Sequence, residues 1–576
     1  MLDFASLYLS VFCGSLALPP AFLFARFIYR RIEPHIRVVV AYFIYSKLTF
    51  RRQCLRVSGL GLSVLIIYIV ANALFLGVST NGEVDLENRA AAMAAMNLML
   101  IFLGGKTNLL ADLVRFPLSS YYLAHRCIAV IAAAEALLHS GLILYRRPVF
   151  DEFAKSGTVL SPAAGGLLVT IFGSLWLYRF LGRFFGLLHL LGAVGVLGGL
   201  VWHIVLREIS PAGIPVFVAC GLLGSTHLYR LVRMFLFNHT QATVETRWDK
   251  EVVVQLKLAT DKPVKVFPGC YFYVFFNGPL PFYDLFHGYA MTPFWGSPAQ
   301  FINGEVSDPT FLITRKGHHA KSLGCVSSGD SLRLDGPYGR DLKLYRYETV
   351  VLTAKGIGIV GVLPFALQLA GRRQRDDEAR SRHARLRDSS EPVFADFSRN
   401  VDVIWWLEHD YQDQWVADQL KSLQELDSQN LLVVWCIYPD SKKASNSFQK
   451  NKYWSAQSNF GFDSFSRELR QEARYPGETI VVVLIKFIMI ASGDSEFVDQ
   501  IRHIVLQNIT SKRSIRFANV DFVAPPGPPN HPSDNRSESQ VALVNSPNKN
   551  EPAHSDATGI EMDTVDQRGR RITHVV

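Results

Sequence analysis

The feature that most constrains this chain is the concentration of apolar residues before about residue 240. About 20 consecutive apolar residues span a bilayer as a helix, and the sequence contains seven such stretches. Charged residues make up only 19% of the chain, against about 25% in ordinary globular proteins. These patterns exclude a purely soluble enzyme and a disordered protein. The seven stretches are roughly 4–25, 57–78, 89–105, 120–144, 158–178, 184–206 and 214–237.

Lysine and arginine beside these stretches predict their orientation, because cytoplasmic connections carry an excess of both residues. The connection 26–56 holds eight of them, whereas the connection 79–88 holds three acidic residues and no basic one. Seven spans then place the N-terminus outside and everything after 237 in the cytoplasm. Arg146, in the loop 145–157, goes against the rule. Membrane lipid, rather than nucleic acid, therefore accounts for the net charge of +9.

Four histidines recur at one spacing inside two of the stretches. His125 and His139 lie in the fourth, and His189 and His203 lie in the sixth. Fourteen helical residues come within about 40° of four full turns and advance by about 21 Å, so each pair shares one helix face. Both helices run in the same direction in the predicted orientation. His125 therefore meets His189 near the cytoplasmic surface, and His139 meets His203 near the outer one.

Two facing imidazoles at one depth can hold a haem iron from both sides, as in electron carriers. Two such levels would carry electrons across the membrane. The alternative is that each histidine is an interfacial or hydrogen-bonded core residue, and the equal spacing in two helices favours the haem interpretation. His227, in the seventh stretch, has no partner at the same spacing and is interpreted as structural. The seven cysteines show no CxxC spacing, so neither a disulfide framework nor covalently attached haem is indicated.

With these residues in view, the sequence resembles the ferric reductase/NADPH oxidase family, whose members bind two b-type haems through the same histidine spacing. Ser58-Gly-Leu-Gly and Arg89-Ala-Ala-Ala-Met are similar to the fungal metalloreductase branch. The resemblance covers about 55–523. It implies that the four histidines ligate haem iron in a multidomain membrane protein. The implied parts are a seven-helix transmembrane haem bundle (1–239), a ferredoxin-reductase-like FAD-binding β-barrel (240–345), an α/β NAD(P)H-binding domain with a parallel sheet (346–523) and a disordered tail (524–576).

Short strand patterns bounded by Gly and Pro indicate a small antiparallel β domain after residue 243. Pro268-Gly269-Cys270-Tyr271 and the turn Asp335-Gly336-Pro337-Tyr338-Gly339 resemble the flavin landmarks of ferredoxin-reductase-like proteins. The family's flavin motif is His-Pro-Phe followed by Ser or Thr, and its nearest match is Thr292-Pro293-Phe294-Trp295. Thr292 replaces the histidine and Trp295 the small hydroxyl residue. FAD stays the implied ligand, with Trp295 stacking on its ring or obstructing it.

The segment 349–369 predicts a strand, a glycine turn at Lys355-Gly356-Ile357-Gly358 and a helix. Such a unit lets a pyrophosphate approach the backbone N–H groups at a helix N-terminus; the alternative is a plain strand–helix turn. The apolar runs 401–407 and 431–438 predict further buried parallel strands. The family's last strand ends in Cys-Gly near the nicotinamide, and Phe487–Asp494 resembles it with Ser492 before Gly493. The polar segments 371–398 and 439–476 look like insertions.

The resemblance implies an NAD(P)H-dependent ferric-chelate reductase of the plasma membrane. NADPH or NADH would reduce FAD, and electrons would cross two haems to chelated Fe(III) or Cu(II) outside. No catalytic acid or base is required, because the cofactors supply the chemistry. One alternative is an NADPH oxidase that reduces dioxygen to superoxide. Another is a non-catalytic relative, suggested by Thr292, Trp295 and Ser492. NADPH or NADH, and any permease or oxidase partner, stay open.

Overall fold

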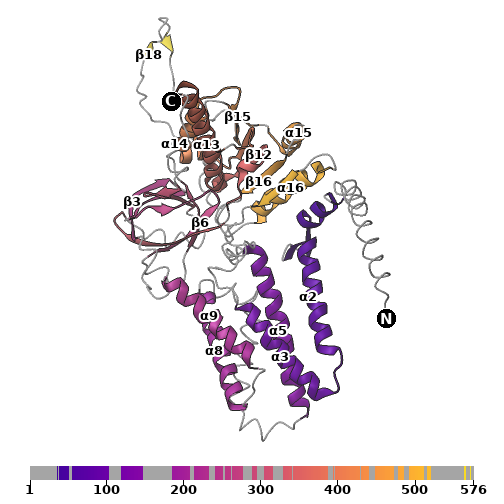
Figure 1. The fold of residues 1–576 in the computed structure, drawn as a ribbon. Coiled ribbons are helices and arrows are strands. Elements are labelled where there is room, and N and C mark those ends of the chain that lie inside the picture. The colour runs from indigo at the N-terminus through magenta and orange to yellow at the C-terminus, as the bar shows by residue number, and fades with distance from the viewer. Residues whose placement is uncertain are drawn as a thin grey trace, which may run out of the picture. The chain divides into compact units, whose positions relative to one another are not determined.

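The structure is a computed structural model of residues 1–576 (Figure 1). The chain divides into two compact units, residues 1–528 and 529–576. In the second unit the described residues form two antiparallel strands, β18 (Thr564–Val565) and β19 (Arg571–Ile572). The residues that the structure describes are 36, 38–50, 55–102, 118–146, 184–207, 213–232, 241–250, 253–260, 262–276, 289–294, 304–314, 328–339, 341–386, 394, 396–427, 430–439, 448–458, 460–472, 478–484, 492–510, 515–519, 564–565 and 571–572.

Before residue 240, the described residues in regular elements are helical apart from one hairpin, β1 (Lys47–Phe50) with β2 (Leu55–Ser58). Ser58 caps the helix that follows, since its hydroxyl accepts a hydrogen bond of 3.1 Å from the Gly61 N–H. The helices described in this half are α2 (Gly59–Gly77), α3 (Glu83–Ile101), α5 (Leu118–Arg146), α8 (Phe184–Arg207) and α9 (Ile214–Val232).

Three of the described helices are long and apolar enough to cross a membrane: α2, Leu123–Ile143 within α5, and Leu188–Val205 within α8. The apolar part of α9, Ile214–Tyr229, is shorter. Five of the seven predicted stretches coincide with described helices, namely α2, α3, α5, α8 and α9. The stretches 4–25 and 158–178 lie outside the described residues, so the number seven stays a prediction.

The outer surface of these helices is apolar. Apart from Phe397, every exposed large hydrophobic side chain among the described residues lies between Ile36 and Tyr229. A water-soluble protein rarely exposes a continuous apolar surface of this extent. A helix satisfies its own backbone hydrogen bonds and can present such a surface to lipid. The first half of the chain is therefore the membrane part.

One buried polar cluster joins three of the membrane helices. The Asn97 amide nitrogen on α3 donates to Asn72 Oδ1 on α2 at 2.8 Å and to Glu135 Oε2 on α5 at 2.7 Å. The Tyr68 hydroxyl on α2 donates to Asn97 Oδ1. Asn72, Asn97 and Glu135 are each at most 6% exposed. Polar side chains that bond across helices stabilise association inside a membrane, where the hydrophobic effect cannot.

The second half begins with a seven-stranded antiparallel sheet in the order β7-β6-β11-β3-β4-β10-β8. Strands β7 and β8 lie at the two ends of this order. Among the described residues they do not pair with each other, so the described part of the sheet is open. A two-stranded sheet, β5 (Val264–Lys265) with β9 (Glu305–Val306), accompanies it. The seven strands are β3 (Gln241–Lys250), β4 (Val253–Thr260), β6 (Cys270–Phe276), β7 (Tyr289–Met291), β8 (Pro293–Phe294), β10 (Thr310–Thr314) and β11 (Ser331–Gly339).

A six-stranded parallel sheet follows in the order β15-β14-β13-β12-β16-β17. Its strands are β12 (Thr349–Lys355), β13 (Asn400–Trp406), β14 (Leu432–Ile437), β15 (Trp454–Gln457), β16 (Thr479–Leu484) and β17 (Ile515–Asn519). The helices are α13 (Ile359–Leu386), α14 (Ala417–Leu426), α15 (Phe462–Glu472) and α16 (Ser492–Asn508), and the 3₁₀ segments are η2 (Leu344–Arg346), η3 (Gly356–Gly358) and η4 (Gln412–Val416).

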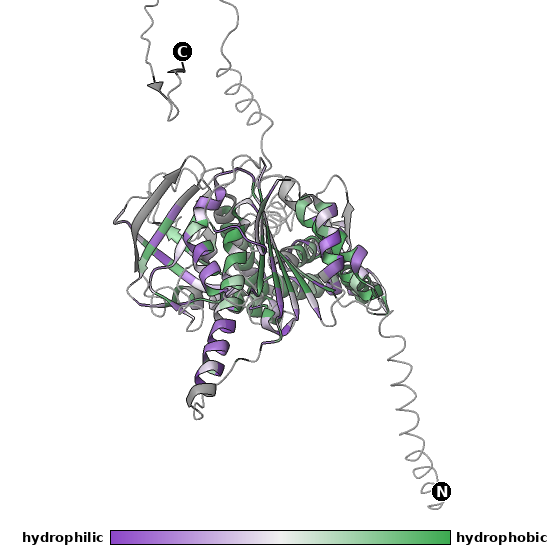
Figure 2. Cartoon of the chain, turned by 90° about the horizontal axis from the view of Figure 1, so that it is seen from above, coloured by the Kyte–Doolittle hydropathy of each residue, from purple (hydrophilic) through white to green (hydrophobic). Residues whose placement is uncertain are grey.

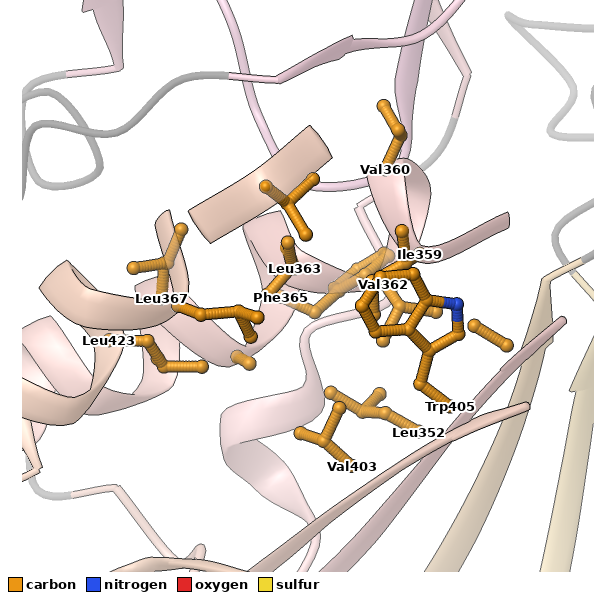
Figure 3. Close-up of a cluster of buried hydrophobic side chains, with 14 of the residues drawn as sticks. Leu352, Ile359, Val360, Val362, Leu363, Phe365, Leu367, Val403, Trp405 and Leu423 are labelled. Atoms are coloured by element: carbon orange, nitrogen blue, oxygen red, sulfur yellow. The ribbon is translucent and has the colours of Figure 1, made fainter. Parts of the chain in front are cut away.

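Both faces of the parallel sheet are buried, as its continuous apolar strands require. Leu352 of β12 packs with α13 and α14 on one face, and Val351 packs with α15 and α16 on the other. Figure 3 shows the first of these cores, with Leu352, Val403 and Trp405 of the strands beneath Leu363 and other side chains of α13. In Figure 2 the central strands are apolar, while polar residues gather on the outer helix surfaces.

The polar segment 371–398, expected to be a solvated loop or helix, is helical up to Leu386, where it continues α13, and its Arg372 pairs with Asp396 at 2.6 and 2.7 Å. Two details differ from the sequence predictions. The described part of 439–476 is not an insertion, because it supplies β15 and α15 with the buried side chains Trp454 and Phe465. The segment 335–339 is the end of strand β11, with a register shift between Asp335 and Tyr338, rather than a free turn. Periodicity missed these features because short polar strands carry little pattern.

We predict that Asn97→Leu destabilises the membrane helices. The change leaves the Glu135 carboxyl and the Asn72 amide buried without their shared partner, and each such group costs about 1–3 kcal/mol. A lower melting temperature of the detergent-solubilised protein is expected. Met96→Leu is the matched control, because the neighbouring Met96 side chain is half exposed on the apolar surface. Equal melting temperatures for both variants would contradict a stabilising role of the cluster.

Candidate functional site

The inner pair of predicted histidines comes together between α5 and α8. The ring centroids of His125 and His189 lie 6.2 Å apart, with the ring planes inclined by 68°. A histidine-bound metal lies about 2 Å from the ring nitrogen, and the nitrogen lies about 1 Å from the ring centre, so two imidazoles on one metal have centroids about 6 Å apart. Both side chains are partly buried on apolar helices. The pair therefore fits axial ligation of one haem iron.

Helix α3 ends beside this inner pair. The Tyr121 ring, one turn before His125, lies 6.1 Å from the His125 ring. The Tyr121 hydroxyl is 3.5 Å from the Ile101 carbonyl oxygen at the end of α3. The end of α3 thus contacts the beginning of α5, and the two helices run antiparallel.

The outer histidine of α5 is held by the beginning of α3. His139 Nδ1 lies 3.0 Å from the Glu87 backbone oxygen. A neutral imidazole carries one N–H, so a hydrogen bond from Nδ1 to a carbonyl leaves the Nε2 lone pair for a metal. His203 lies on α8, 14 residues after His189, and is partly buried. The meeting of His139 with His203 stays a prediction.

An ion pair explains why Arg146 departs from the predicted charge rule. Arg146, the last residue of α5, pairs with the Glu87 carboxylate, and both side chains are largely buried. The same end of α3 carries Arg89, which donates to the Val78 and Ser79 carbonyl oxygens at 2.6 and 2.9 Å. Arg89 thereby satisfies backbone carbonyls beyond α2. The acidic connection 79–88 and the end of α5 therefore lie at one end of the bundle; which side of the membrane that end faces stays a prediction.

Thr292, the residue in place of the family's histidine, is buried in the antiparallel sheet region. It is 8% exposed, and its hydroxyl has no hydrogen-bond partner among the described residues. A buried hydroxyl normally has a partner, so the position suits a polar group of a ligand. Pro293 and Phe294 form β8, which pairs with β10. Trp295 lies outside the described residues, so its effect on a flavin stays a prediction.

Close backbone packing explains the glycines of the second flavin landmark. A Cβ on Gly336 would lie 2.4 Å from the Phe272 ring, and a Cβ on Gly339 would lie 2.4 Å from the Gly269 carbonyl oxygen. Gly339 also has a φ of 105°, a backbone angle that residues other than glycine rarely adopt. The two landmarks, far apart in sequence, are therefore in contact.

Three tyrosines gather where the landmarks meet. The rings of Tyr271, Tyr273 and Tyr338 have centroids 5.5–5.7 Å apart. The Tyr338 hydroxyl donates to Asp335 at 2.8 Å. Burial raises the pKa of the adjacent Cys270 thiol to about 12, so this cysteine is a neutral packing residue. The three side chains are at most 7% exposed, so the cluster is an aromatic core that packs the two landmarks together.

The predicted glycine turn lies at the carboxyl edge of the parallel sheet. Gly356 follows β12 directly and has a φ of 53°, and η3 leads into α13. The Trp405 indole N–H donates to the Gly356 carbonyl at 2.8 Å, which fixes the turn. Strand β12 lies between β13 and β16. The chain therefore adds strands on one side of β12 first and on its other side later, and the order of strands reverses at β12. Ligands of open α/β sheets bind at such a reversal.

Ser492 and Gly493 are not at the end of a strand. They begin helix α16, and the strand before them is β16, which ends at Leu484. The predicted strand over Phe487–Asp494 is therefore wrong for its last residues, while residues 485–491 lie outside the described ones. The apolar run of 480–490 extends across both segments, so periodicity could not locate the end of the strand.

Comparison with known proteins bears on this geometry. Residues 90–200 match the family model described as the ferric reductase like transmembrane component. This segment contains His125, His139 and His189. The chain is 24% identical over 303 residues to ferric reductase transmembrane component 3 of Saccharomyces cerevisiae, covering 49% of this chain and 40% of that protein. Residues 90–200, in the membrane part of the chain, are therefore similar to the ferric reductase like transmembrane component.

A second relative extends the similarity beyond the membrane part. The chain is 22% identical over 463 residues to a probable ferric reductase transmembrane component of Candida albicans, covering 73% of this chain and 62% of that protein. The chain spans less than two thirds of the length of these curated relatives. Among solved structures, a ferredoxin reductase in carbazole 1,9a-dioxygenase matches 49% of this chain and 69% of its own with 14% identity and a TM-score of 0.29, which is too low to define the fold.

The sequence alone missed residues that act through the backbone or through distant contacts. Glu87 contributes its carbonyl oxygen to His139, and no residue pattern reveals a backbone acceptor. Tyr271 and Tyr273 fall in a predicted strand and Tyr338 in a predicted turn, but no pattern joined the three. The alternation of Tyr271 and Tyr273 along β6 could have indicated one shared face, because alternate strand residues point the same way.

We predict that the four histidines act in two pairs. His125→Ala and His189→Ala should each lose the same haem and retain about half of the haem, because one iron needs both ligands. His139→Ala and His203→Ala should each lose the other haem. Haem content per chain and the dithionite-reduced optical spectrum measure this. His227→Ala is the control and should keep both haems; full haem content in His125→Ala would contradict the pairing.

We also predict that Glu87→Gln weakens retention of the outer haem while its carbonyl stays in place. Loss of the ion pair with Arg146 loosens the contact of the beginning of α3 with the end of α5, and such outer-shell changes typically cost about 10–100-fold in metal affinity. The rate of haem transfer to apomyoglobin reports this loss. The charge-swapped double variant Glu87→Arg/Arg146→Glu should restore retention, and Glu83→Gln, an exposed position one turn earlier, should have no effect.

Proposed function

We propose that this chain is a transmembrane oxidoreductase that uses cytoplasmic NAD(P)H, FAD and two b-type haems to reduce chelated Fe(III) or Cu(II) on the other side of the plasma membrane. The observation that carries the proposal is the 6.2 Å approach of the His125 and His189 rings, on two helices that each carry a second histidine 14 residues later. The family of the membrane part supports it.

The residues would hold the cofactors at three places. The four histidines would ligate the haem irons, and the Glu87 carbonyl would orient His139. Thr292 would contact the flavin, and the buried side chains Tyr271, Tyr273 and Tyr338 would hold the two glycine landmarks in place. The Gly356–Gly358 turn would receive the nucleotide pyrophosphate on backbone N–H groups at the start of α13. When bound, these cofactors supply the hydride and electron transfer; the protein sets their positions and excludes water.

The proposed acceptor follows from the relatives. Two of them, from Candida albicans and Saccharomyces cerevisiae, are named ferric/cupric reductase transmembrane components. The matched regions are partial, at 54% and 40% of those proteins. A metal chelate is accordingly proposed as the electron acceptor. Dioxygen is the alternative acceptor, and the experiment must distinguish the two.

We predict that Gly356→Val abolishes haem reduction by NADPH and NADH. Its φ of 53° strains a β-branched residue, and a new Cβ would lie 2.6 Å from Glu408 Oε2. Purified protein is mixed with nucleotide under argon, and the reduced haem spectrum is followed. Dithionite should still reduce the variant fully, which shows that the haems remain bound. Gly371→Ala is the matched control, since a Cβ there meets nothing within 4 Å.

The acceptor is identified with the wild type in sealed vesicles. Ferric and cupric chelates outside should be reduced at the expense of nucleotide inside, in the presence of superoxide dismutase. Superoxide as the main product would instead identify an oxidase. Stoichiometric haem without FAD, and without reduction by either nucleotide, would identify a non-catalytic relative and end the proposal.

A further inference from the structure

An acidic side chain lies over the glycine turn of the nucleotide site. The parallel strands β12 and β13 are adjacent, with Lys355 beside Trp406 at their carboxyl ends. Gly356 follows the first strand, and Glu408 follows the second by two residues. A Cβ on Gly356 would lie 2.6 Å from Glu408 Oε2 and 2.9 Å from its carboxyl carbon. The carboxylate therefore contacts the turn itself.

The position of Glu408 is built into the fold. Its backbone N–H donates to Gln412 Oε1 at 2.8 Å, and Gln412 is 1% exposed. The preceding residue, Leu407, donates its N–H to the Ile437 carbonyl of the next strand at 2.9 Å. On the other side, Trp405 holds the Gly356 carbonyl. Buried contacts thus fix the backbone around Glu408 and the backbone of the Gly356 turn. The Glu408 side chain is only partly exposed.

In doubly wound sheets, a side chain at this position contacts the bound dinucleotide. When a dinucleotide places its pyrophosphate at the first glycine turn, the adenosine ribose reaches the end of the neighbouring strand. A carboxylate there accepts hydrogen bonds from the ribose 2′-hydroxyl. A 2′-phosphate carries about −1.5 to −2 charges and no donor, so the same carboxylate repels it. NADH and NADPH differ only in this group.

We propose that Glu408 is a specificity-determining residue that selects NADH over NADPH by accepting hydrogen bonds from the adenosine ribose. The inference rests on the proposed function, because it assumes that the Gly356 turn binds a pyridine dinucleotide. It goes further by naming which dinucleotide.

The test measures binding rather than turnover. Full-length protein with its cofactors, in detergent, is titrated calorimetrically with NADH and NADPH and with the oxidised forms NAD⁺ and NADP⁺. The wild type should bind NADH and NAD⁺ at least about tenfold more tightly than their phosphorylated counterparts, as a lost charge-assisted contact predicts. Glu408→Gln should reduce this ratio towards one, and Glu408→Arg should reverse it.

A further variant serves as the control. Glu425→Gln removes an exposed carboxylate of α14 and should leave the ratio unchanged. Tighter binding of NADPH by the wild type, or a ratio that Glu408→Gln does not alter, would overturn the inference while the proposed function survives. Absence of binding by either nucleotide would overturn both.

Discussion

A buried imidazole needs a partner for each of its two nitrogens, and inside an apolar bundle water cannot supply one. His139 meets the first half of this requirement with the Glu87 carbonyl, which leaves the other nitrogen for a metal. His125 and His189 face each other at a spacing that one metal atom fills. The direction of α5 and α8, the contact of α3 with both ends of α5, and the candidate electron path all depend on this requirement.

The second half of the chain solves a different problem, which is to bring polar groups to one edge of buried sheets. Parallel strands end together, so residues that follow β12 and β13 become neighbours although about 50 residues separate them. The antiparallel sheet brings its two glycine landmarks together by pairing β6 with β11. Both arrangements need glycine where backbones or carboxylates approach closely, as at Gly339 and Gly356.

Much of this could be predicted from the sequence, because strong periodic signals coincide with the elements. The five described membrane helices, the strands β12, β13 and β14, and the turn at Gly356 all lie where the pattern placed them. Strands β15 and β16 were missed or misplaced, since the first is short and polar and the second merges into a longer apolar run. The orienting carbonyl of Glu87 and the carboxylate of Glu408 depend on tertiary contact, which no local pattern encodes.

The outer imidazole takes its orientation from a third helix that carries none of the four histidines. Its acceptor, the Glu87 carbonyl, lies in the second turn of α3, close to a short exposed connection in which Ser79 and Gly82 have positive φ angles. Natural variation in that connection can therefore shift the beginning of α3, and with it the orientation of the His139 ring, while all four histidines stay in place. Surface residues outside the two histidine helices thereby influence a side chain inside the bundle.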